Sequence, residues 1–183
     1  MFKYFLILIF FTLLSNTQAS NKEKIIENLQ NTKSLNFHFE QNINGKIEKG
    51  NCIIEYPKKI FCNYDNTNNK ILVSNGRSLV IKTKSGSYYR YSLKKTPLNY
   101  ILDKNFLINE IQNLEERIID NKFINFKILK EDNEINIFFN NTNYNLVGWQ
   151  TLDIYQNLSI TYISSLKTNQ QLKSNIFKLP DSN

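Results

Sequence analysis

Apolar and polar residues alternate along most of the chain after residue 34, which is the pattern of β-strands with one buried face. In LNFHFEQ (35–41), Phe37, Phe39 and Gln41 share one face, whereas His38 lies on the other. Similar runs predict further strands at 70–83, divided by an Asn75-Gly76 hairpin turn, and at 88–93, 122–130, 134–139, 144–154 and 159–166.

Three segments follow a helical period instead. The clearest is 21–34; the segment 97–102 starts with a proline suited to a first helical turn, and 106–116 continues as helix. On the first two segments the apolar residues share one face, which we expect to cover the sheet as a lid: Ile25, Ile26, Leu29, Leu98, Ile101 and Leu102.

This succession predicts a mainly β (α+β) fold, in which a strongly curved antiparallel sheet or incomplete antiparallel β-barrel carries short helices on its concave side. Apolar residues at alternate positions would line the inside: Phe37, Phe39, Ile54, Leu72, Leu79, Ile81, Phe126, Ile128, Ile135 and Ile137. Alternation alone leaves two interpretations open, an ordinary packed core and an apolar cavity.

The first twenty residues, MFKYFLILIFFTLLSNTQAS, have the order of a secretory signal peptide. Lys3 precedes an apolar run that is too short to span a bilayer, and Thr17 and Ala19 stand at the positions that signal peptidase reads. A buried N-terminal strand or helix is the alternative. We therefore expect a signal peptide at 1–19 and a single exported domain at 20–183, without a cysteine near the cut to carry a lipid.

The formal net charge is +7, and removal of Lys3 with the signal peptide lowers it by one. A basic balance can indicate nucleic acid or an anionic membrane as a partner. Here the lysines are scattered, and the excess of Lys, Asn, Ile, Phe and Tyr over a single alanine is typical of AT-rich coding. Nucleic acid is not an expected partner.

The two cysteines, Cys52 and Cys62, flank Pro57 in GNCIIEYPKKIFCNYD (50–65). If this stretch is a hairpin, both lie on one face within reach of a disulfide, which export also favours. Two buried free thiols are the main competing interpretation. Two cysteines with the single histidine, His38, are too few for a structural zinc site, and no Cys-x-x-Cys motif occurs.

Motifs for catalysis are missing. The chain has no Gly-x-Ser-x-Gly, phosphate loop or His-Glu-x-x-His, and His38 lies on a polar strand face. Glu115 and Glu116 are adjacent at a solvated helix end. We expect neither an enzyme nor a cofactor nor a metal site.

Several short motifs follow one another in a recognisable order. A helix precedes KSLNFHFEQ (33–41), and a hairpin around Pro57 ends in Tyr64. The later motifs are VSNGRSLVI (73–81), KTPLNYIL (95–102), LVGWQTLDIYQNLSITYI (146–163) and NIFKLP (175–180). Their order resembles the periplasmic outer-membrane lipoprotein carrier family (LolA), and the later motifs are similar to strands and a helix of that family.

The resemblance implies an incomplete barrel whose apolar cavity shields the acyl chains of lipoproteins on their way from the inner to the outer membrane. It implies a monomer in the periplasm of a Gram-negative bacterium. Its partners would be acylated lipoproteins, an inner-membrane lipoprotein-release transporter and an outer-membrane acceptor. The alternative is an exported binding protein for another apolar ligand, such as a free lipid or a hydrophobic peptide; an enzyme acting on lipid is more distant.

One departure concerns closure of the cavity. The family usually carries arginines around the hairpin proline, where this chain has Tyr56 and Phe61. Without them, the pattern predicts that the lid is held by apolar contact and not by a charged hydrogen bond.

Overall fold

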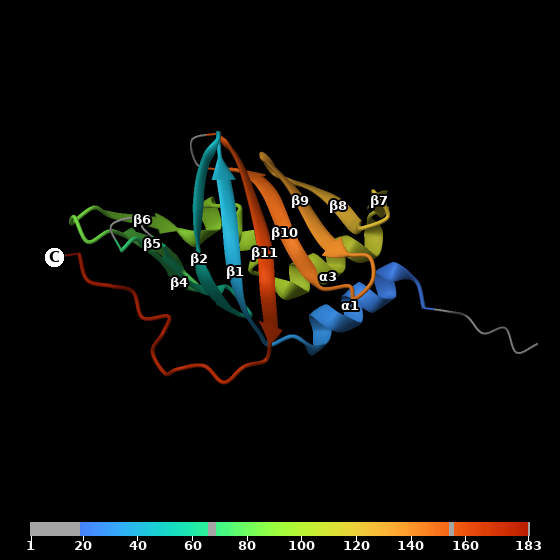
Figure 1. Cartoon of the computed structure of the whole chain (residues 1–183), viewed down its shortest axis with the longest axis horizontal. Helices are drawn as coiled ribbons and strands as arrows, with labels where there is room; N and C mark the ends of the chain where they lie inside the picture. The colour runs from blue at the N-terminus through green and yellow to red at the C-terminus, as the bar shows by residue number, and fades with distance from the viewer. Residues whose placement is uncertain (1–18, 66–68, 154–155, 183) are drawn as a thin grey trace, which may run out of the picture.

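The computed structural model describes residues 19–65, 69–153 and 156–182, so the predicted signal peptide lies outside the described residues apart from Ala19. Its helices are α1 (Asn21–Asn31), α2 (Leu98–Ile101), α3 (Lys104–Asn113) and the 3-10 helix η1 (Leu93–Lys95) (Figure 1). Its strands are β1 (Ser34–Ile43), β2 (Lys46–Glu55), β3 (Lys59–Tyr64), β4 (Ile71–Asn75), β5 (Ser78–Lys82), β6 (Tyr88–Ser92), β7 (Arg117–Ile119), β8 (Phe123–Lys130), β9 (Asn133–Asn140), β10 (Leu146–Leu152) and β11 (Leu158–Thr168).

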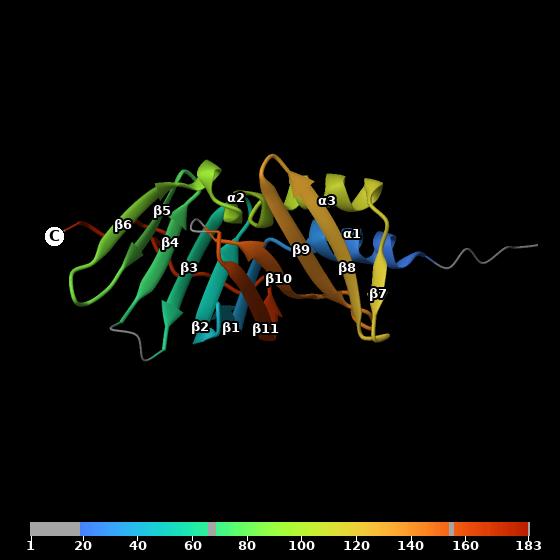
Figure 2. The same ribbon diagram turned by 90° about the horizontal axis from the view of Figure 1, so that it is seen from above.

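All of these strands belong to one antiparallel sheet in the order β6-β5-β4-β3-β2-β1-β11-β10-β9-β8-β7. Strands β6 and β7 are its two edges, so the sheet curves without closing into a barrel (Figure 2). The predicted fold, a strongly curved antiparallel sheet with short helices, is confirmed. The central pairing of β1 with β11 joins strands from the two ends of the chain.

Helices α1 and α3 lie beside the β7–β9 half of the sheet, away from β4–β6 (Figures 1 and 2). Their apolar faces are buried through Ile25 and Leu29 of α1 and through Leu107 and Ile111 of α3. One half of the inner face is therefore filled by helix, whereas these two helices leave the other half uncovered.

Helix α1 is shorter than the predicted 21–34. It starts with a capping box, in which the Ser20 hydroxyl accepts from the Glu23 N–H at 3.3 Å and the Glu23 carboxylate accepts from the Ser20 N–H at 2.7 Å. It ends at Asn31 because Thr32 adopts an extended conformation and β1 begins two residues later. Strand β7 at 117–119 was not predicted, since three residues carry no period.

Gly50 on β2 allows a close approach that shapes the inner face. A Cβ atom there would lie 2.1 Å from the backbone oxygen of Asn63 and 2.9 Å from the Phe39 ring. The Phe39 ring instead packs edge-on against Tyr64, with ring centroids 4.9 Å apart. The missing side chain therefore permits an aromatic pair on the inner face of the sheet.

Candidate ligand-binding cavity

A cavity of about 580 Å³ lies between the β1–β6 half of the sheet, the inner faces of β10 and β11, and the segment at 96–98. The strands alternate, so the side chains that line the cavity come from every second residue of β1, β3 and β5. Its apolar lining includes Phe39, Ile43, Ile60, Leu72, Leu79, Ile81, Tyr89, Tyr91, Leu98, Trp149 and Leu152.

The structure divides the predicted cavity residues into two groups. Phe39, Leu72, Leu79 and Ile81 line the cavity. The others are packed in the hydrophobic core and do not border it: Phe37, Ile54, Phe126, Ile128, Ile135 and Ile137. All six are fully buried. Those on β8 and β9 lie in the half of the sheet that α1 and α3 fill.

The predicted lid is divided in the same way. Leu98 lines the cavity together with Thr96 and Pro97. Ile101 and Leu102 are buried in the core, and so are Ile25 and Leu29, with Ile26 packed against them. No residue of α1 lines the cavity in the part of the chain that the structure describes, because α1 packs in the other half of the sheet. Among the described residues, Leu98 is the member of the predicted lid that borders the cavity.

A charged contact fastens the residues that follow α2 to the β2–β3 turn, contrary to the expectation of apolar contact alone. The Lys58 N–H donates to the Leu102 carbonyl at 2.7 Å, and the Lys58 ammonium lies 3.2 Å from the Asp103 carboxylate. Sequence reasoning considered Tyr56 and Phe61 instead. Phe61 alternates with the cavity residue Ile60 and therefore points to the opposite face of the sheet.

Tyr56 forms no charged contact through its side chain. Its hydroxyl is buried without a hydrogen-bond partner among the described residues, and burial raises the pKa of this group above its ordinary value. The backbone of the neighbouring Lys58, not the side chain at 56, connects the turn to α2.

Cys52 and Cys62 are register partners on β2 and β3, and their sulfur atoms form a disulfide. The pairing places the bond in the wall of the cavity, where both residues contribute to the lining. No group of three or more His, Cys, Asp or Glu residues that could hold a metal occurs within 19–65, 69–153 and 156–182. Over the same ranges, no helix is long and apolar enough to cross a membrane.

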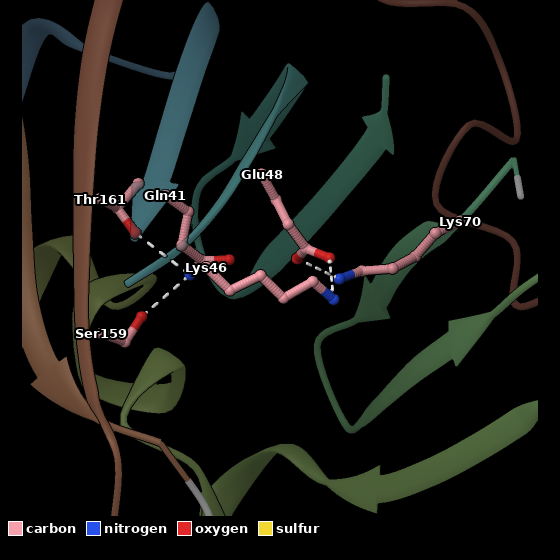
Figure 3. A network of polar contacts seen from close by, with 6 residues as sticks. All are labelled: Gln41, Lys46, Glu48, Lys70, Ser159 and Thr161. Carbon is pink, nitrogen blue, oxygen red and sulfur yellow. Dashed lines mark hydrogen bonds and ion pairs between the residues drawn. The ribbon is translucent and has the colours of Figure 1, made fainter. Parts of the chain in front are cut away.

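One end of the cavity is polar, which sequence reasoning did not single out. Gln41 donates to the hydroxyls of Ser159 at 3.0 Å and Thr161 at 3.3 Å (Figure 3). Glu48, which is 6% exposed, contacts the ammonium groups of Lys46 at 3.1 Å and Lys70 at 2.5 Å. The alternation along the strands could have indicated these positions, because Gln41 shares a face with Phe39 and Glu48 shares one with Cys52.

Glu48 remains a carboxylate in this setting. Burial by itself would raise the pKa of Glu48, but hydrogen bonds and Coulomb attraction from Lys70 and Lys46 outweigh it, so the pKa lies below its usual range. Lys70 is held from a second side, since its ammonium lies 3.9 Å from the centre of the Tyr64 ring. The polar end is thus a network of charges and hydrogen bonds that holds its own geometry.

Comparisons with known proteins agree with this architecture. The family model described as outer membrane lipoprotein carrier protein LolA matches residues 30–180. None of the curated proteins searched matches the sequence. Among solved structures, an uncharacterized conserved protein from Thermus thermophilus superposes with a TM-score of 0.52 at 5% identity, covering 88% of this chain and 95% of that one.

Two further structures are more distant in superposition. A LolA superfamily protein, NE2245 from Nitrosomonas europaea, has a TM-score of 0.43 at 12% identity and covers 88% of this chain and 99% of its own. A putative outer membrane lipoprotein-sorting protein domain from Vibrio parahaemolyticus has a TM-score of 0.49 at 8% identity, with coverages of 85% and 95%.

Proposed function

Because the chain belongs to the outer membrane lipoprotein carrier protein family LolA, we propose that it is a carrier which holds the acyl chains of lipoproteins in the cavity bounded by β1–β6. The cargo would be taken from an inner-membrane release transporter, carried through the periplasm as a complex with the monomer, and delivered to the outer membrane or to an acceptor there. The observation that carries this proposal is the cavity of about 580 Å³ with apolar walls, since binding pockets for small molecules commonly measure about 300–1,000 Å³.

The energetic need for such a cavity follows from the cargo. Burial of a methylene group is worth about 0.8 kcal/mol, so exposing one acyl chain of about sixteen carbons to water costs roughly 12 kcal/mol. Walls such as Leu72, Leu79 and Ile81 can take up part of that surface. A carrier must also release its cargo, and a cavity left open between sheet and α2 holds a chain less completely than a bilayer does.

Access to the cavity would be controlled at α2. Leu98 contributes to the wall, while the contacts of Lys58 with Leu102 and Asp103 hold the other end of this short helix against the β2–β3 turn. Both Lys58 and Asp103 are partly exposed, at 30% and 26% of their side-chain area, so water can replace the ion pair when the segment moves. This arrangement favours a closure that is specific and weak.

Mass spectrometry of material that co-purifies with the protein from the periplasm of a Gram-negative host tests the proposal. Acylated proteins are the expected companions, and they should be lost on replacement of the half-buried cavity residue Ile81 by glutamate. Bare lipid or an apolar peptide as the main companion would favour the alternative, a binding protein for another apolar ligand. The absence of any apolar companion would contradict both.

A further inference from the structure

The polar end of the cavity forms a continuous surface across three neighbouring strands and the residue that precedes β4, which we call the polar wall: Gln41, Lys46, Glu48, Lys70, Ser159 and Thr161 (Figure 3). Register joins its members, since Gln41 on β1 pairs with Glu48 on β2 and with Thr161 on β11. Ile43 likewise stands between Lys46 and Ser159. The rest of the lining is mainly apolar and includes residues of β1, β3–β6 and β10 and the segment at 96–98.

The members of the polar wall face the cavity, and Glu48, Ser159 and Thr161 are buried by the protein. Ser159 and Thr161 are each 4% exposed. Whatever fills the cavity therefore decides whether their polar groups keep hydrogen-bond partners. A pure hydrocarbon placed against these hydroxyls would displace water without offering a hydrogen-bond acceptor, which costs free energy.

The polar wall offers donors more than acceptors. The hydroxyl oxygens of Ser159 and Thr161 accept from Gln41, and each hydroxyl still has a proton to donate. The Glu48 oxygens, by contrast, are engaged by the two lysines. Lys46 has three ammonium protons, and its side chain is 72% exposed, so protons remain beyond the contact with Glu48. A complementary ligand must bring acceptor oxygens.

We infer that the cavity selects acyl compounds that carry an ester or amide carbonyl at the end of the apolar chain, with the carbonyl oxygen accepting hydrogen bonds from Ser159 and Thr161. This inference rests on the proposed function and adds the chemical class of the ligand to it. The apolar chain lies along Leu72, Leu79 and Ile81, and the carbonyl lies at β1 and β11. A site built to hydrogen-bond a ligand discriminates against an analogue that lacks the partner group.

Displacement of the apolar fluorescent probe N-phenyl-1-naphthylamine by methyl decanoate and by 1-chlorodecane tests the inference. The two compounds share the chain, but only the ester has a carbonyl. We expect the wild-type protein to prefer the ester. Thr161→Val, which keeps the shape and removes the hydroxyl, should weaken ester binding about three- to tenfold and leave chlorodecane binding unchanged.

The chain offers a matched control in Thr168→Val, the same substitution at an exposed position of the same strand β11 that does not line the cavity. It should leave the preference for the ester unchanged. Ser159→Ala is the second variant should Thr161→Val lower the melting temperature, and it should also reduce the preference.

The outcomes separate the inference from the proposed function. Equal affinity of the wild-type protein for both compounds, with no selective effect of Thr161→Val, would overturn the inference and leave the carrier proposal standing. A loss of preference in Thr168→Val alone would show that the preference does not depend on the polar wall and would also overturn the inference. Failure of both compounds to displace the probe from the wild-type protein would contradict the carrier proposal itself.

Discussion

Glutamate substitutions at Ile81 and at Phe126 are expected to affect different properties, ligand affinity at Ile81 and stability at Phe126. Ile81 lines the cavity, whereas Phe126 lies in the packed core. Ile81 is half-buried and borders open volume, so a carboxylate at that position can stay hydrated. Loss of part of its apolar contact should cost about 1 kcal/mol of the free energy of unfolding. The charge in the path of the acyl chain should reduce affinity by at least about tenfold, which is about 1.4 kcal/mol.

Phe126 is 0% exposed and packs edge-on against Phe139, with ring centroids 6.2 Å apart. Removal of a buried phenylalanine costs about 3–5 kcal/mol, and an unpaired buried charge adds several more. Domains have a total stability of about 5–15 kcal/mol, so Phe126→Glu should unfold the protein or bring it close to unfolding.

The assay pairs thermal melting with titration of a fluorescent fatty-acyl probe. Ile118→Glu is the control, because Ile118 on the edge strand β7 is 43% exposed and remote from the cavity lining, and it should change neither reading. If Ile81→Glu unfolds the protein as Phe126→Glu does, the β5 wall is a core. If Ile81→Glu binds the probe like the wild-type protein, the ligand lies elsewhere.

Three further predictions concern the contacts around the cavity. Lys58→Met should speed hydrogen exchange at 97–102 without a change in β1, and should lower the free energy of unfolding by about 0.2–1 kcal/mol. Exchange equal to that of the wild-type protein would show that the ion pair with Asp103 does not fasten α2. The pKa of Glu48 is lowered on folding, so the stability that this carboxylate contributes is present above the pKa of the unfolded chain, about 4.3, and is lost as the pH falls through the folded value. Between about pH 6 and about pH 3, a range that spans this window, the melting temperature of Glu48→Gln should therefore fall less than that of the wild-type protein. Parallel curves would refute this prediction. Reduction of the disulfide between Cys52 and Cys62, which closes a loop with a sequence separation of 10, should cost about 3 kcal/mol in the chain-entropy model; thiol labelling of both residues in denatured, unreduced protein would show instead that the bond is absent.

Local pattern was enough to predict the strands other than β7 and several turns. Asn75-Gly76 predicted the β4–β5 hairpin because this dipeptide favours tight hairpin turns. Ser74 indeed pairs with Leu79 across the turn, and Gly76 adopts a positive φ of 95°. The shared face of Cys52 and Cys62 followed from the period of two along a hairpin around Pro57. Such features depend on residues close in sequence, which can be compared directly.

Which inward-facing residues meet a helix and which meet open volume was decided only by tertiary structure. Phe39 and Phe126 have the same local pattern and both belong to the hydrophobic core, but of the two Phe39 also borders the cavity. The contacts at the polar wall and at α2 join residues far apart in the chain: Gln41 with Thr161 across 120 positions, and Lys58 with Asp103. Alternation reports the side of the sheet to which a residue points, whereas the group that it meets there depends on how the sheet curves and where α1, α2 and α3 pack.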